Sequence, residues 1–459
     1  MADETATLAR WVATVRVPEA TRRVTRRYLI DWLGSALGGG ELLPPTMVRD
    51  IVRDLGGHPQ ATILATGERT SAPLAALANG AAAHVLEMDD LDRESISHPG
   101  APIIAGALAV AEREGASGDA LLDAIAIGYE ASIRVGEALG TTHYEYWHTT
   151  STAGVIGAAA AAARLGCLDG DATLRALGSA GTMAAGLWEF LADGAMSKQL
   201  HPGKAAHDGV LAALLGARGF TGATRILEGP KGLLAAMSRA PEADRITRGL
   251  AGGLDGSSMA RWRIETVSFK VHASCRHTHS AVDGALAIRR RREFAIDDIE
   301  RVDVRIYTQA LGLLEGMEPT TPYAAKFSLP FCVAAALRHG DLAPQRFTDE
   351  AIGDTKTLAL ADRIDFAPDA TLDALYPSAW PAVVALTLRN GERIEERVDH
   401  PAGDPESGIT ERDIAEKFIA LTDTLLAGRA AKVASRILEG APAADEIVRL
   451  TRQTVPARP

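Results

Sequence analysis

The chain has few cysteines, no long apolar run and no secretory leader pattern. Its 459 residues include Cys167, Cys275 and Cys332, an odd and widely spaced set that argues against a disulfide framework and for a reducing compartment. The longest apolar runs, at 101–111 and 153–163, fall short of the roughly 18 apolar residues that a membrane span needs. The N-terminus has neither a basic region nor an apolar region of the secretory type. We therefore expect a cytoplasmic protein with no membrane partner.

Basic residues are fewer than acidic residues. The chain has 48 Lys and Arg residues against 59 Asp and Glu residues, a formal net charge of -11. Binding to nucleic-acid phosphates requires a concentrated basic face. The dense basic run at 289–292 is followed at once by Glu293, which is typical of a solvated helix end. The sequence therefore predicts no nucleic-acid partner.

Several motifs of hydrolases and nucleotide-binding enzymes are missing from the sequence. It contains no Gly-x-Ser-x-Gly elbow, no Walker A sequence and no GxGxxG that joins a strand to a helix. The cysteines form no structural zinc pattern. These absences give little support to a nucleophilic hydrolase or a nucleotide-dependent enzyme.

Length and periodicity predict a large helical domain at the N-terminus. A chain of 459 residues exceeds the size at which one hydrophobic core keeps growing, so at least two domains are expected. Residues 1–266 are rich in Ala, Leu and Gly, and apolar residues recur at helical spacing in 21–37, 120–139 and 205–217. Small side chains fill 157–163, which lets helices approach closely. We predict that this part is all-helical.

Strand patterns appear after residue 259. Polar and apolar residues alternate in 261–269 and 299–307, and Asn390-Gly391 separates two alternating runs, as in a type I′ hairpin. With helices predicted at 280–292 and 326–338, residues 267–402 would form an α+β domain.

A helical pattern returns at Thr410, so 403–459 are expected to pack on the first domain. The predicted fold class is mainly α: a large all-helical domain with a smaller α+β lid domain inserted before the C-terminal helices.

Four polar segments interrupt this apolar sequence. They are residues 87–98, 144–148, 198–204 and 270–279, and nine of the 12 histidines lie in or near them. Clustered titratable side chains in an otherwise apolar chain are typical of a functional site. We therefore interpret the four segments as walls of one site.

The first segment crowds carboxylates before a histidine. Glu87, Asp89, Asp90 and Asp92 lie within six residues and precede His98. Neighbouring carboxylates raise one another's proton affinity, and one held beside His98 would fix the tautomer of the imidazole. The alternative is an acidic helix end that leads into a loop.

The second and third segments each precede an Ala-rich helix. Tyr146 and His148 come before a helix N-terminus, which favours an anionic ligand, and Lys198 is a candidate clamp for a carboxylate. A structural histidine and a surface lysine are the alternatives.

The fourth segment combines cations with possible metal ligands. His272, Cys275, His277 and His279 are of the types that bind transition metals, but their spacing matches no common metal motif. The adjacent Lys270 and Arg276 would repel a metal ion and suit a polyanionic substrate, so no metal is expected. A small hydrophobic role for the Cys275 thiol is favoured over a thiolate paired with His277.

In their order and spacing, these segments resemble the 2-methylcitrate dehydratase (MmgE/PrpD) family, which also contains cis-aconitate decarboxylase and iminodisuccinate epimerase. The resemblance spans nearly the whole chain. It rests on NGAAAH at 79–84, EMDD at 87–90, HP at 98–99, WHTT at 147–150, LHPGKAA at 200–206, GFTG at 219–222 with ILEG at 226–229, the 270–279 segment and AKFSLP at 325–330.

The resemblance implies a homodimer with no required cofactor and a cleft between the domains for a small di- or tricarboxylate. The implied catalytic residues are Asp90, His98, His148, Lys198, Lys270 and His279. The implied substrate-binding residues are Glu87, Asp89, Tyr146, Cys275, Arg276 and His277. One departure is Glu87, where some members carry aspartate, and the loop to His98 is one residue longer.

The mechanism expected from these residues is removal of a proton beside a carboxylate. Lys198, Lys270 and Arg276 would hold substrate anions and stabilise the aci-carboxylate, because electrostatic stabilisation is usually the largest catalytic term. His98 or His148 would move the proton, and Asp90 would orient the imidazole.

The same residues support dehydration, epimerisation and decarboxylation. Dehydration of the 2-methylcitrate dehydratase type is favoured because it is the commonest assignment in the family that the chain resembles, with epimerisation of a substituted succinate and cis-aconitate-type decarboxylation as alternatives. A non-catalytic carboxylate-binding scaffold and a zinc-dependent hydrolase are hypotheses of other classes.

Overall fold

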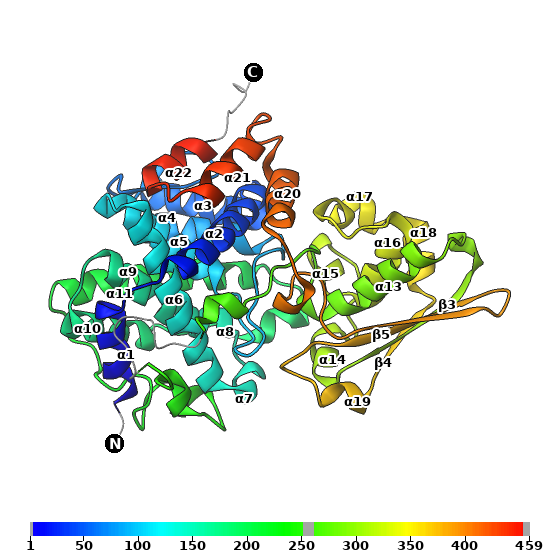
Figure 1. The fold of residues 1–459 in the computed structure, drawn as a ribbon, viewed down its shortest axis with the longest axis horizontal. Helices are drawn as coiled ribbons and strands as arrows, with labels where there is room; N and C mark the ends of the chain where they lie inside the picture. The colour runs from blue at the N-terminus through cyan, green and yellow to red at the C-terminus, as the bar shows by residue number, and fades with distance from the viewer. Residues whose placement is uncertain (1–2, 251–260, 453–459) are drawn as a thin grey trace. The chain divides into compact units, whose positions relative to one another are not determined.

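The computed structural model describes residues 3–250 and 261–452, and the chain divides into two compact units (Figure 1). Unit 1 comprises residues 1–85, 89–267 and 410–459, and unit 2 comprises 86–88 and 268–409. The fold is mainly α with a smaller α+β region, as predicted. Among the described residues, no helix is long and apolar enough to cross a bilayer.

Unit 1 is a stack of helices. Its longer helices are α1 (Glu4–Thr14), α2 (Glu19–Gly39), α3 (Leu43–Leu55), α4 (Ala72–His84), α5 (Gly100–Glu114), α6 (Gly118–Leu139), α9 (Gly154–Leu165), α10 (Gly170–Thr182), α11 (Ser197–Ala217), α20 (Glu411–Thr422), α21 (Ala430–Glu439) and α22 (Ala444–Thr451). Short helical turns are α7 (Thr141–Tyr144), α8 (Thr149–Thr152), α12 (Leu233–Met237), η1 (Trp188–Ala192), η2 (Ala243–Ile246) and η3 (Arg263–Thr266).

Small residues let the central helices of unit 1 pack closely. α11 packs on α4, α9 and α10. A Cβ atom on Gly80 of α4 would lie 2.9 Å from the Cα atom of Gly203 of α11, and one on Gly209 would lie 2.6 Å from the Cβ atom of Ala158 in α9. Larger side chains at these positions would push the helices apart. This close packing brings the C-terminal end of α4 beside the first turns of α11.

Two parts of unit 1 differ from the sequence prediction. A short hairpin, β1 (Ala61–Thr62) and β2 (Arg69–Thr70), interrupts the region predicted to be all-helical. The strand predicted at 261–269 is wrong, because this segment contains η3. The backbone N–H of Arg263 donates to Oε2 of Glu130 at 2.7 Å, so a tertiary contact takes the place of a strand partner.

The C-terminal helices belong to unit 1. Thr410 and Asp413 form a capping box at the start of α20, as the polar N-terminal signal predicted. α20 packs on α2, where the Lys417 ammonium lies 2.6 Å from the Asp31 carboxylate.

Unit 2 is built on a four-stranded sheet of order β4-β3-β5-β6. β3 (Ile299–Ile306) pairs in parallel with β4 (Ile364–Pro368) and antiparallel with β5 (Ala382–Leu388), which pairs antiparallel with β6 (Arg393–Val398). The β5–β6 hairpin predicted from Asn390-Gly391 is confirmed. Its turn is not type I′, because φ is positive at Gly391 (85°) but not at Asn390, and the Gly391 backbone N–H donates to the Leu388 carbonyl at 2.8 Å.

Helices cover the sheet of unit 2. α13 (His279–Arg291) packs on β5, β6 and α16 (Leu329–His339), and Figure 1 shows α13, α16 and α18 gathered on one side of the sheet. The helices predicted at 280–292 and 326–338 correspond to α13 and α16. The shorter elements are α14 (Thr308–Leu314), α15 (Pro322–Ala325), α17 (Asp349–Ile352), α18 (Thr355–Ala361), α19 (Ala370–Asp373), η4 (Arg276–Thr278), η5 (Ile296–Asp298), η6 (Pro344–Phe347) and η7 (Pro405–Ser407).

Candidate functional site

Unit 1 gathers histidines from four separate stretches of the chain. His84 ends α4, His98 lies just before α5, His148 precedes α8, and His201 lies in the second turn of α11. The ring centroids of His84 and His98 are 5.0 Å apart, those of His84 and His148 5.6 Å, and those of His148 and His201 5.3 Å. The packing of α4 on α11 therefore builds one imidazole cluster from distant residues.

His98 is held in a defined tautomer. Its Nδ1 lies 2.7 Å from the backbone carbonyl oxygen of Asp90. A carbonyl oxygen only accepts hydrogen bonds, so Nδ1 carries the hydrogen and the neutral ring has its lone pair on Nε2. The Asp89 carboxylate lies 3.5 Å from the same Nδ1, where it would stabilise a protonated ring. This arrangement makes His98 a candidate general base.

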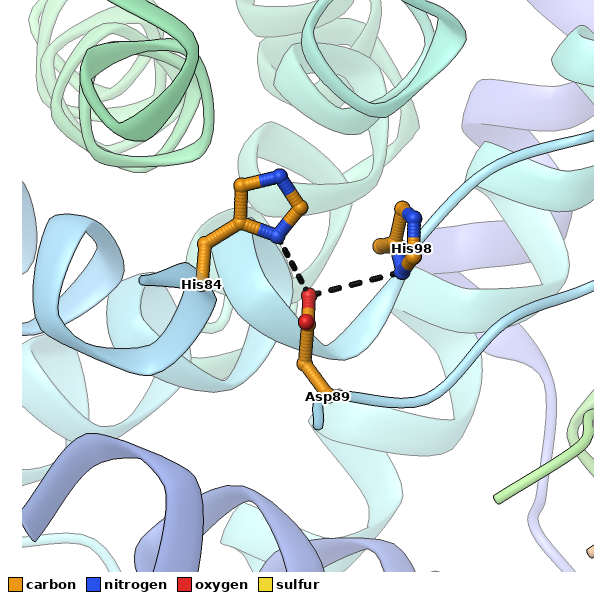
Figure 2. A group of neighbouring side chains, drawn as sticks. All are labelled: His84, Asp89 and His98. Atoms are coloured by element: carbon orange, nitrogen blue, oxygen red, sulfur yellow. Dashed lines mark hydrogen bonds and ion pairs between the residues drawn. The ribbon is translucent and has the colours of Figure 1, made fainter. Parts of the chain in front are cut away.

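Asp89 also forms a hydrogen bond with His84. His84 is not among the site residues predicted from the sequence. His84 Nδ1 lies 2.6 Å from Asp89 Oδ2, and Figure 2 shows this carboxylate between the rings of His84 and His98. Both His84 and Asp89 are buried. His84 Nε2 is buried too, with no hydrogen-bond partner among the described residues. The motif at 79–84 was the available signal for this histidine.

Asp90 acts through its backbone as well as its side chain. Its carboxylate accepts hydrogen bonds from the Tyr129 hydroxyl at 2.6 Å and from the Gly100 backbone N–H at 3.0 Å. Burial raises the pKa of Asp90 well above its usual range, despite the opposing Tyr129 hydrogen bond. The side chain thus anchors the start of α5, and the Asp90 carbonyl orients His98.

His148 and Lys198 lie in the same buried region of unit 1. Burial, and then the charges of His201, His84, Lys198 and His98, lower the pKa of His148 well below its usual value. The Lys198 ammonium is buried. A neutral imidazole near a buried cation suits proton transfer at a carbon beside a carboxylate. His201 was not predicted, although it follows Lys198 by three residues, one helical turn.

A metal ion fits the His84, Asp89 and His98 group poorly. One ligand atom from each residue lies within 4.8 Å of the others. However, His98 Nδ1 donates to the Asp90 carbonyl, and His84 Nδ1 hydrogen-bonds to the Asp89 carboxylate. Coordination would need lone pairs on both nitrogens and would leave the carbonyl unpaired. The donor set therefore fits a hydrogen-bonded network better.

In unit 2, Lys270 is paired with Glu87. The ammonium lies 3.0 Å from Glu87 Oε2, and the side chains are 0% and 1% exposed. The Lys326 ammonium donates to the backbone carbonyls of Leu86 and Ala273 at 2.9 and 2.8 Å. It therefore ties the backbone beside Glu87 to the backbone that follows Lys270. The positive charge of Lys270 is thus paired with a carboxylate of its own unit. The sequence analysis named both residues as site candidates but did not predict that they pair.

His279 uses both ring nitrogens. Nδ1 accepts a hydrogen bond from Arg276 at 3.1 Å, so Nε2 carries the hydrogen and donates to the Ser274 carbonyl at 3.3 Å. Burial, followed by the charge of Arg276, lowers the pKa of His279 well below its usual value. Arg276 also pairs with the buried Asp404. These contacts suit a positioning role better than direct proton transfer.

The other predicted binding residues lie in different surroundings. His277 bonds to the Tyr307 hydroxyl and stacks on Trp380 with ring centroids 4.3 Å apart. Cys275 is buried and its backbone N–H donates to the Lys326 carbonyl at 2.9 Å. Tyr146, in contrast, is 60% exposed.

Comparisons with known proteins cover both units. The profile of the MmgE/PrpD N-terminal domain matches residues 6–246, and that of the MmgE/PrpD C-terminal domain matches residues 272–440. A cis-aconitate decarboxylase-like protein of Aspergillus oryzae is 24% identical over 92% of this chain and 91% of the relative. The cis-aconitate decarboxylase of Aspergillus terreus is 23% identical (92% and 89% covered), and that of Mus musculus is 25% identical (88% and 83% covered).

Proposed function

This chain belongs to the MmgE/PrpD family, and we propose that it is a lyase of a small di- or tricarboxylate that works by proton transfer at a carbon beside a carboxylate. The observation that carries the proposal is the state of His98. The Asp90 carbonyl directs its lone pair to Nε2, and the Asp89 carboxylate stands 3.5 Å behind Nδ1. A base held in this way gains stability when it takes a proton.

The roles in unit 1 follow from this geometry. His98 takes or returns the substrate proton at Nε2, and Asp89 stabilises the resulting imidazolium. The buried Lys198 ammonium supports the negative charge that develops on the substrate carboxylate. Each proton-transfer element of this kind contributes roughly 10²–10⁴-fold to a rate.

Two bond cleavages are compatible with these residues. The relatives described above support decarboxylation, in which the carbanion left by carbon dioxide takes a proton from the enzyme. The dehydration favoured by the sequence analysis remains the second candidate, because the cluster holds several imidazoles and dehydration needs both a base and an acid. Epimerisation would use the same base without net cleavage.

Three residues of unit 2 are also given roles in the proposal. Lys270 and Arg276 are proposed to bind substrate carboxylates, and His279 to position Arg276 through their 3.1 Å hydrogen bond. A homodimer, a cytoplasmic location and independence from cofactors remain predictions.

The deciding experiment is proton NMR of the purified, chelator-treated protein in deuterium oxide. The substrates are cis-aconitate, 2-methylcitrate, citrate and both enantiomers of simple substituted succinates. Itaconate from cis-aconitate identifies a decarboxylase, a new alkene from a hydroxy acid identifies a dehydratase, and deuterium wash-in without cleavage identifies an epimerase. No change in any substrate would contradict the proposal.

A His98→Asn variant ties the activity to the site. The Asn amide can occupy the place of Nδ1 and donate to the Asp90 carbonyl, but it has no counterpart of Nε2. We expect turnover to fall at least about 100-fold. The matched control is His339→Asn, at the end of α16, whose activity should equal that of the wild type. Wild-type turnover in His98→Asn would show that His98 is not the base.

A further inference from the structure

His148 and His201 face each other through the same type of ring nitrogen. Their Nδ1 atoms lie 3.1 Å apart, although the residues are 53 positions apart in the chain. Two nitrogens at this distance require a hydrogen between them, because two facing lone pairs repel. One ring is therefore the Nδ1–H donor and the other is the acceptor.

The surroundings of both rings favour the neutral form. Burial, and then the charges of neighbouring groups, lower the pKa of His148 well below its usual value and that of His201 to about 4. The titratable groups that face the pair come from three elements: His84 at the end of α4, His98 before α5, and Lys198 and Lys204 in α11. The rings of Trp188 and Phe190 lie 4.8 and 6.5 Å from that of His148. These neighbours disfavour a net positive charge on the pair.

A neutral imidazole carries one N–H, which fixes the outer nitrogens of the pair. If the bridging hydrogen belongs to His148, then His148 Nε2 has the lone pair and His201 Nε2 carries a hydrogen. If it belongs to His201, the assignments are reversed. In either state the pair presents one proton acceptor and one proton donor.

We propose that His148 and His201 form one acid–base couple and that His201 is a positioning residue that sets the tautomer of His148 during the reaction. This inference rests on the proposed lyase function and adds a residue to its machinery. When His148 donates its Nε2 proton to the substrate, the bridging hydrogen moves from His201 Nδ1 to His148 Nδ1, and His201 Nε2 takes a proton from water. The couple remains neutral, and His148 has changed from acid to base.

The exposure of the two rings suits this direction of proton flow. His201 is 9% exposed and His148 is 1% exposed, so His201 is the ring nearer to solvent. His148 is accordingly the ring assigned to the substrate side. In a dehydration, the acid form of His148 would donate to the departing hydroxyl, and in a decarboxylation, to the carbanion.

The backbone around the couple is built for close approach. The Gly186 carbonyl accepts the His148 backbone N–H at 3.0 Å, and Ser151 Oγ donates to the His201 carbonyl at 3.3 Å. Gly186 has a φ of 127°, and a Cβ atom there would lie 2.9 Å from the Ser151 Cβ atom and 3.3 Å from His201 Nδ1. Glycine is therefore required for the two rings to meet.

The first test measures tautomers and does not depend on turnover. Long-range proton–nitrogen NMR of the full-length protein labelled with ¹⁵N-histidine distinguishes the two neutral tautomers and the cation, with assignments from His148→Asn and His201→Asn. At pH 7 we expect His148 and His201 to be neutral and in opposite tautomers. A cationic ring, or the same tautomer in both, would overturn the proposal.

The second test separates the couple from a merely structural contact. In His201→Asn, the amide takes the place of His201 Nδ1 as the hydrogen-bond partner of His148, but nothing replaces His201 Nε2. In His201→Leu, the counterparts of Nδ1 and Nε2 are both absent. A couple predicts that both variants lower kcat by roughly 100-fold, change the pH profile of kcat and leave KM within about threefold. A structural contact predicts that Asn restores the wild-type kcat and profile.

A control comes from the same helix. His207 lies six residues after His201 in α11 and hydrogen-bonds to its neighbour Asp208 at 2.9 Å, so His207→Asn should retain wild-type kinetics. If the wild type turns over none of the carboxylates, the proposed function fails while the NMR result still decides the couple. If the wild type is active and His201→Asn equals it, the couple alone fails.

Discussion

Breaking the buried Glu87–Lys270 pair should destabilise unit 2 and reveal what the lysine binds. The perturbations are Glu87→Gln, Lys270→Met and the double variant. The ammonium and carboxylate are 3.0 Å apart and at most 1% exposed. With an effective dielectric constant of about 20, their attraction is about 5.5 kcal/mol before desolvation costs are subtracted.

The expected costs follow from removing the opposite charge beside a buried ion. Each single variant should lose about 3–5 kcal/mol, because the remaining buried charge loses the attraction that offsets its desolvation. The double variant removes both charges, so its loss should be smaller than the sum of the single losses by about 2–3 kcal/mol.

The assay is hydrogen exchange measured by mass spectrometry during guanidinium unfolding. A chain with two units need not unfold in one step, so peptides from 268–409 report on unit 2 separately from unit 1. Thr320→Ala, an exposed change in unit 2, is the control and should unfold like the wild type. Single losses that add to within 0.5 kcal/mol in the double variant would refute the pairing.

The same variants test the proposed binding of substrate anions. Glu87→Gln removes the competing carboxylate and leaves the positive charge of Lys270, so the KM for a polycarboxylate should fall. Lys270→Met should raise that KM. An unchanged KM in both folded variants would assign the pair to structure alone.

Three further predictions concern pH and assembly. The pKa values of His143 and His201, each lowered to about 4, mean that the unfolded chain binds protons there below about pH 6.5 when the folded chain does not. The stability present above pH 6.5 should therefore fall towards pH 4 by about 3 kcal/mol for each residue, and melts of His143→Asn should show a smaller acid loss. Asp92 changes stability in the opposite direction with pH. Burial is the main cause that raises the pKa of Asp92 to about 7, so the stability that the protonated carboxyl contributes is present below pH 3.8 and is lost as the pH rises through 7. Asp92→Asn should accordingly raise Tm relative to the wild type at pH 8 but not at pH 4, and equal shifts at both pH values would exclude ionisation as the cause. On α3, four apolar side chains at four-residue spacing, Leu43, Met47, Ile51 and Leu55, are 52–67% exposed and form a strip on the order of 400 Å². Two copies paired through this strip would bury on the order of 800 Å² from these side chains, below the roughly 1,000 Å² that a stable interface needs, so a dimer on this face must also bury neighbouring residues. If the predicted homodimer uses this face, light scattering should find a dimer that Ile51→Glu converts to a monomer.

Local sequence signals predicted many of the elements. Helical periodicity located α2, α6 and α11, and Asn390-Gly391 located the β5–β6 turn, because hydrophobic spacing and turn chemistry act over a few residues. The exception at 261–269 has the alternation of a strand but forms η3. There the Glu130 carboxylate, from a distant helix, takes the backbone N–H of Arg263.

The types of side chain needed for carboxylate chemistry were also visible in the sequence. The four polar segments and their order indicated the family, and the profiles of both its domains match the chain. Residue types and spacing, however, do not say which nitrogen of a histidine carries the hydrogen. That depends on an acceptor such as the Asp90 carbonyl, whose direction is set by the loop before α5.

By itself, the sequence determined the mainly helical fold, the inserted strand-bearing region and the supply of buried cations, carboxylates and imidazoles. Only the tertiary structure decided the partners: His84 with Asp89, His148 with His201 across 53 residues, and Lys270 with Glu87 across 183 residues. The physical reason is the difference in sequence separation over which the two kinds of interaction act. Spacing rules act within one helix or hairpin, whereas proton affinity depends on burial and on charges that folding brings within a few ångströms.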